Sequence, residues 1–166
     1  MALITTAIMG TATIEVDRMD PATQMRLADE IFAQQPNLLG SVLVLSRMGV
    51  GMVQLEVPIR ILLCTFQAMK GCKRKWPLIT EDIQEACLQR LTGRVRFTEG
   101  LTAAHSNEVV TQFIAEHREP HLLAFVYGTL AEHDLLAVRT EAGKSLMLAA
   151  LNLAECVAYV GQSARR

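Results

Sequence analysis

Apolar residues recur every three or four positions along most of this 166-residue chain. That spacing places them on one face of a helix. The pattern is clearest over 52–69 and 140–161, where it runs through several turns with little interruption. Further segments with the same spacing lie at 20–35, 38–51, 80–93 and 106–130. The sequence therefore predicts an all-α fold, a single-domain bundle of five or six helices.

Residues that begin or interrupt helices support this division. Asp20 stands before Pro21, and an N-cap aspartate followed by proline is a common helix start. Thr80 and Thr140 are predicted N-caps of two further helices. Pro58 is expected to begin or kink its helix, because proline lacks the N–H that an interior turn requires.

The N-terminal segment has a different composition. Residues 2–16 are rich in isoleucine, valine and threonine and are interrupted by Gly10, which favours a short strand or hairpin over a helix. The segment also lacks the basic start of a secretory signal. We therefore expect an extended N-terminal segment at 1–19, followed by a single helical domain at 20–166.

Composition and charge exclude several classes of protein. Hydrophobic residues make up 51% of the chain, which is too apolar for a disordered or collagen-like protein. A formal net charge of -1 gives no overall attraction to nucleic acid or to an anionic membrane. Four cysteines without a CxxC pair predict reduced thiols. We expect a cytoplasmic protein without a membrane span, because no run of roughly 20 apolar residues is evident.

Association is the preferred hypothesis for function. Several segments carry near-continuous apolar faces, and large apolar patches usually mark interfaces, so we expect a homo-oligomer. The segment 70–77 holds the densest basic run together with glycine and proline, which predicts a loop. In this hypothesis the loop meets an acidic protein partner. The residues expected to make the contact are Lys70, Lys73, Arg74, Lys75, Trp76 and Arg94.

Nucleic-acid binding through residues 70–96 is an alternative. Lysines and arginines could hold phosphates there while the indole of Trp76 stacks on a base. The sequence pI of about 6.4 is far below that of dedicated nucleic-acid-binding domains. A loop in solvent whose cations pair with nearby carboxylates explains the same pattern.

A second alternative is an enzyme that binds a metal or another ligand through histidines and carboxylates at 105–134. His117 and His121 are four residues apart, the spacing that lets two imidazoles share a metal on one helix face. Pro120 interrupts that face, and no HExxH motif is present. The candidate metal ligands are His117, His121 and His133.

Cys72 is a candidate reactive thiol. It lies among Lys70, Lys73, Arg74 and Lys75, and nearby cations would lower its pKa by stabilising the thiolate. An ordinary loop cysteine is the competing interpretation. The phosphate-loop, dinucleotide and nucleophile-elbow motifs do not occur, and no cofactor follows from the sequence.

Overall fold

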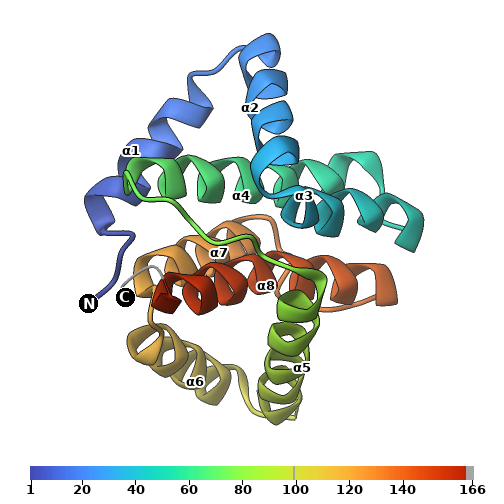
Figure 1. Cartoon of the computed structure of the whole chain (residues 1–166). Helices are drawn as coiled ribbons and strands as arrows, with labels where there is room; N and C mark the ends of the chain where they lie inside the picture. The colour runs from blue at the N-terminus through green and yellow to red at the C-terminus, as the bar shows by residue number, and fades with distance from the viewer. Residues whose placement is uncertain (99, 164–166) are drawn as a thin grey trace.

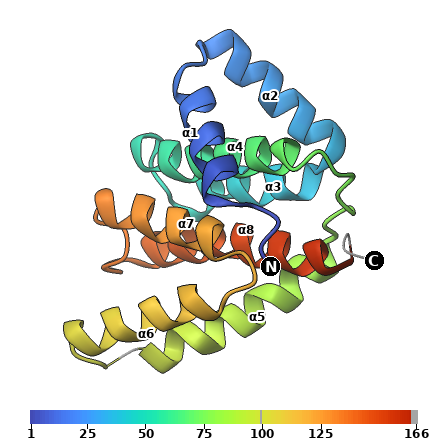
Figure 2. The same ribbon diagram turned by 90° about the vertical axis from the view of Figure 1, so that its left-hand side faces the viewer.

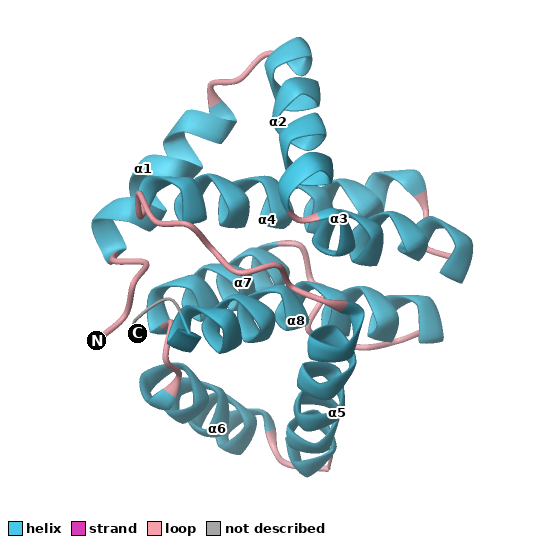
Figure 3. Ribbon diagram, in the orientation of Figure 1, coloured by secondary structure: helices cyan, strands magenta, loops and turns pink. Residues whose placement is uncertain are grey.

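The computed structural model describes residues 1–98 and 100–163, and within them it is entirely helical (Figure 1, Figure 3). These residues form eight α-helices and one short 3-10 helix, more than the five or six helices expected. The elements are α1 (Thr6–Asp17), α2 (Pro21–Gln34), α3 (Pro36–Leu43), η1 (Val44–Met48), α4 (Met52–Gly71), α5 (Glu81–Thr98), α6 (Ala103–Glu116), α7 (Pro120–Glu132) and α8 (Glu141–Ser163).

The helices lie in successive layers around α4 and α8. Figures 1 and 2 show α1 and α2 on the outer side of α4, with α7 and α8 beneath α4 and α5 and α6 beyond them. Helix α4 packs against α1 and α8, and α8 packs against α5 and α7. The two central helices therefore connect the N-terminal and C-terminal parts of the chain.

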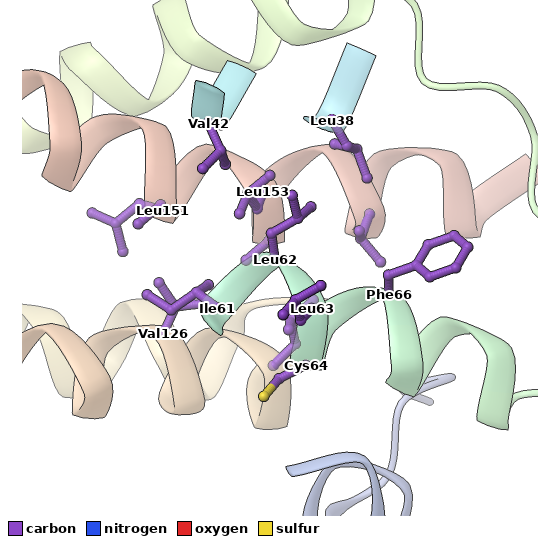
Figure 4. Close-up of a cluster of buried hydrophobic side chains, with 14 of the residues drawn as sticks. Leu38, Val42, Ile61, Leu62, Leu63, Cys64, Phe66, Val126, Leu151 and Leu153 are labelled. Atoms are coloured by element: carbon purple, nitrogen blue, oxygen red, sulfur yellow. The ribbon is translucent and has the colours of Figure 1, made fainter. Parts of the chain in front are cut away.

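One continuous cluster of buried side chains fills the space between these layers. It extends from Ile4 to Val160 and draws on α3, α4, α7 and α8 at its centre (Figure 4). Leu62 on α4 and Leu153 on α8 are both about 1% exposed. Ala150 and Ala154 are fully buried on α8, where their small size lets neighbouring helices approach closely.

The predicted N-terminal strand or hairpin is wrong, because Thr6–Asp17 form α1 and no strand occurs in residues 1–98 or 100–163. The side chain of Thr5 caps the helix by accepting from the N–H of Ile8. Met9, Ala12 and Val16 share a buried face that packs on α4. Burial of this face outweighs the β-propensity of the threonines and isoleucines, since tertiary packing regularly overrides local propensity.

The predicted helix starts at residues 20, 80 and 140 are confirmed. The Asp20 carboxylate accepts from the N–H of Thr23 at 2.7 Å. The hydroxyl of Thr80 accepts from Ile83, and that of Thr140 from Gly143. Each bond satisfies one of the free N–H groups at a helix start. Pro58 lies buried inside α4 rather than at its start.

Helices α4 and α8 are long and apolar enough to cross a membrane, judged by length and composition. The core helix of a soluble protein has the same properties, and most of each apolar stretch is buried against other helices. The absence of a membrane span therefore stays a prediction.

Candidate functional site

A cavity of about 530 Å³ lies between α5, α6, α7 and α8. Its walls are largely leucine, valine, methionine and phenylalanine side chains. In Figures 1 and 2, α5 and α6 lie on the side of α7 and α8 that faces away from α4. The polar side chains that reach the cavity are Arg94, Ser106, Asn107, Tyr127, Glu141, Lys144 and Glu155.

Helix α6 forms the outer wall of this cavity. The helix has no fully buried residue, and it packs mainly against α7. Its half-buried side chains Val110 and Phe113 line the cavity, together with Ser106 and Asn107. The wall is therefore held by few apolar contacts, as is common for elements that cover a binding site.

A group of three polar side chains from three parts of the chain lies at one edge of the cavity, and two of them, Arg94 and Glu155, line it. Arg94 on α5 donates two bonds to Glu155 on α8, at 3.2 and 3.0 Å. His117, directly after α6, places Nε2 3.4 Å from the same carboxylate. The side chains of His117 and Glu155 are 6% and 11% exposed, and that of Arg94 is 35% exposed. This is a shielded, two-pronged arginine–carboxylate pair, the strongest geometry for such a bond.

The backbone fixes which nitrogen of His117 carries the proton. The N–H of Glu119 donates to Nδ1 of His117 at 3.1 Å, so Nδ1 is the acceptor. The ring proton is therefore on Nε2, which faces Glu155. His117 therefore directs its Nε2 toward the carboxylate, in the way that one ring nitrogen commonly sets the role of the other.

The carboxylate of Glu155 is ionised. Burial alone would raise its pKa, but the hydrogen bonds from His117 and Arg94 outweigh that effect and lower the pKa below the ordinary value of 4.5. Burial raises the pKa of Tyr127, and the negative charge of Glu155 adds to the effect. Tyr127 therefore stays protonated at neutral pH and offers the cavity a hydroxyl donor.

A second, outer cleft of about 340 Å³ adjoins the cavity at Arg94, Phe113 and Glu155, which line both. Arg90 lines this cleft from α5 and lies over the ring of Tyr159, 5.7 Å from its centre. Arg118 lines it from the turn between α6 and α7. The cleft therefore presents arginines next to an apolar cavity.

Of the residues predicted to form the basic contact surface, Lys70, Arg74, Lys75 and Trp76 line one shallow pocket, and Arg94 lies elsewhere. Lys70 pairs with Glu30 at 2.8 Å, and Trp76 is half-buried, with its indole N–H donating to the carbonyl of Met69. Lys73, Arg74 and Lys75 are exposed. Arg94 belongs instead to the group around Glu155. Binding of an acidic protein or nucleic acid through the loop stays a prediction.

The three histidines predicted to hold a metal do not come together. His117 faces Glu155, His121 bonds to the hydroxyl of Thr6, and His133 is exposed just after α7. Residues 1–98 and 100–163 contain no group of three or more histidine, cysteine, aspartate or glutamate side chains placed to hold a metal ion. The break at Pro120, where α7 begins, is the physical reason, since it turns His117 and His121 onto different surfaces.

The predicted lowering of the pKa of Cys72 is wrong. The thiol is half-buried, and burial raises its pKa, an effect to which Glu119 adds and which Arg74 only partly offsets. The thiol lies 3.4 Å from the carbonyl oxygens of Leu3 and Ala68. A donor in that position favours the protonated form, so Cys72 lacks the features of an activated thiol.

Sequence reasoning missed Glu155 as a site residue. Glu155 is the single charged residue in the long apolar stretch 145–164. A lone carboxylate on a helix that is otherwise core-forming needs a partner, and that signal could have identified it. Its partners Arg94 and His117 are 61 and 38 positions away in the chain, so no local motif records the group.

Comparison with known proteins finds no matching family model, no similar curated protein and no similar solved structure. The chemistry of the site therefore has to follow from the residues of this chain.

Proposed function

We propose that the protein binds a small molecule with an apolar body and a polar end in the cavity between α5, α6, α7 and α8. The observation that carries the proposal is the cavity itself, about 530 Å³ of mostly apolar wall with an ionised, shielded pair at one end. Ligand sites commonly have this volume and this combination of apolar walls with few placed polar groups.

The polar groups have separate roles in this proposal. The hydroxyl of Tyr127 and the side chains of Ser106 and Asn107 offer hydrogen bonds inside the cavity. Glu155 is already bonded to Arg94 and His117, so it keeps the cavity end rigid rather than leaving a free charge there. A preformed site of this kind loses little free energy to ordering when a ligand binds.

Filling the cavity should weaken binding. Nile red, a neutral fluorescent dye, is the probe, and its affinity is measured by fluorescence titration. Val110→Trp places a large ring in the cavity from α6, and we expect the dissociation constant to rise at least about tenfold. Ala115→Trp, on the exposed side of the same helix, is the matched control and should leave binding unchanged. Equal binding by both variants would exclude this cavity as the site.

Homo-oligomerisation is a second candidate, favoured by the outer face of α2. Leu27 and Ile31 of this helix are buried, but Met25 and Phe32 are 64% and 67% exposed. These two large apolar side chains are seven residues apart and share one helix face, as in helices that pack against a partner helix. The free energy of such an apolar face is higher when it is exposed to water than when it packs against a second copy of the chain.

The oligomer candidate predicts a clear change in mass. We expect the wild-type protein to sediment as a dimer and the double variant Met25→Gln/Phe32→Gln to sediment as a monomer, since burial of about two large apolar side chains per subunit is lost. Val53→Gln, which changes an exposed valine on α4, is the control and should stay dimeric. A wild-type monomer at the highest soluble concentration would rule the candidate out.

A further inference from the structure

The outer cleft carries an excess of positive charge. Three arginines, Arg90, Arg94 and Arg118, line it against two glutamates, Glu116 and Glu155. The charge of Glu155 is already matched by Arg94, while Glu116 accepts from the neutral amide of Gln112 and keeps its charge, so Arg90 and Arg118 leave the cleft one net positive charge. The guanidinium groups of Arg90 and Arg118 are therefore the cations of the cleft that have donors to spare.

These two arginines are placed to receive an anion. Arg90 is exposed, donates a weak hydrogen bond to the sulfur of Cys87 at 3.4 Å, and lies over the ring of Tyr159. Arg118 is exposed and makes no hydrogen bond or ion pair with residues 1–98 or 100–163. A planar guanidinium with free donors matches the two oxygens of a carboxylate or phosphate.

The apolar cavity begins where the cleft ends. Phe113 and the Arg94–Glu155 pair line both spaces, so a molecule bound in one is next to the other. Arg94 lies over the ring of Phe113, 6.0 Å from its centre, so the boundary has an aromatic as well as a charged side. The arrangement places positive charge directly beside a space suited to an apolar chain.

We infer that the ligand of this site is an amphipathic anion, whose carboxylate or phosphate head lies at Arg90 and Arg118 and whose apolar chain enters the cavity between α5 and α8. The inference rests on the proposed function, because it names the chemical class of the molecule bound in the same cavity. The chain's overall net charge of -1 gives no general attraction for anions, so selective binding must come from this local group.

Four molecules with the same apolar chain test the inference: dodecanoate, dodecyl phosphate, dodecanol and dodecylamine, each titrated by calorimetry below its micelle concentration. We expect at least one of the two anions to bind at least about tenfold more tightly than dodecanol, and dodecylamine to bind most weakly. A preference between the two anions separates a carboxylate head from a phosphate head.

Variants locate the head group. Arg90→Gln/Arg118→Gln should weaken binding of the preferred anion about tenfold and leave dodecanol binding unchanged, because only the anion uses the guanidinium groups. Arg18→Gln/Arg47→Gln removes the same charge from exposed positions elsewhere and should change neither affinity. Circular dichroism confirms that both double variants are folded.

The failures of the two proposals are distinguishable. Equal affinity for dodecanol and the anions, with no effect of Arg90→Gln/Arg118→Gln, would overturn the anionic head group while the cavity proposal stands. Preference for dodecylamine would also overturn it. Failure of all four molecules to bind, together with failure of Nile red to respond to Val110→Trp, would overturn both.

Discussion

Replacement of Glu119 by alanine should lower the free energy of unfolding by about 3 kcal/mol. Glu119 is 1% exposed, and its two carboxylate oxygens accept from the backbone N–H groups of Leu3 and Ile4 at 2.9 and 3.0 Å. Alanine would leave both N–H groups without an acceptor, and Ile4 is fully buried, so water cannot replace the lost bond there. Urea unfolding at neutral pH measures the loss.

Two further variants separate this contact from a general effect of removing charge. Glu132→Ala changes an exposed carboxylate at the other end of α7 and should cost less than about 0.5 kcal/mol. Glu119→Gln keeps one acceptor oxygen, so its loss of unfolding free energy should fall between the losses of Glu119→Ala and Glu132→Ala. Hydrogen exchange should show faster exchange at the amides of Leu3 and Ile4 in the alanine variant. A loss of less than about 1 kcal/mol would mean that the carboxylate does not secure the N-terminal segment.

The role of Glu119 illustrates what the sequence could not reveal. Its bond partners are 116 and 115 positions away, so it appeared in the sequence only as one of several carboxylates near histidines. Long-range pairing of a side chain with a backbone leaves no periodic pattern. For the same reason, the Arg94–Glu155 pair could not be predicted, although the isolated charge of Glu155 marked one member.

Features that arise within one or two turns were predictable. The helices at 52–69 and 140–161, and the caps at Asp20, Thr80 and Thr140, depend on neighbouring residues and follow from spacing and side-chain chemistry. The helix α1 depends on a surface that only the folded chain provides, the buried face of α4, and local propensity favoured a strand there.

A continuous series of polar contacts joins the N-terminal segment to the candidate site. The backbone of Leu3 and Ile4 bonds to the carboxylate of Glu119, whose own N–H bonds to His117. His117 then faces Glu155, which is paired with Arg94. Loosening the N-terminal segment should therefore disturb the orientation of His117, and Glu119→Ala is expected to weaken Nile red binding as well as stability.

The second large effect is expected at Glu155. Glu155→Gln removes the charge but keeps the shape, and we expect a loss of about 2 kcal/mol in the free energy of unfolding at neutral pH. The variant leaves the guanidinium of Arg94 without its anion beside a shielded ring. The estimate lies below the roughly 3–5 kcal/mol of a broken, fully buried pair because the side chain of Arg94 is 35% exposed.

Asp17→Asn provides a matched control. Asp17 makes a similar two-pronged pair with Arg60, at 3.1 and 3.2 Å, but its side chain is half exposed. Exposed pairs contribute little, so this variant should lose less than about 1 kcal/mol. Equal losses at Glu155 and Asp17 would show that shielding of the site adds nothing to the strength of its pair.

The pH dependence of the Glu155 effect follows from the direction of its pKa. Hydrogen bonds from His117 and Arg94 hold the pKa of Glu155 below 4.5 in the folded protein, against the effect of burial. Its carboxylate therefore stabilises the folded state fully above pH 4.5. That stabilisation is lost as the pH falls through the lower pKa that Glu155 has in the folded protein. The difference in urea stability between wild type and Glu155→Gln should be constant around neutral pH and shrink in acid. A difference that grew as the pH fell would mean that the folded site holds Glu155 in its protonated form.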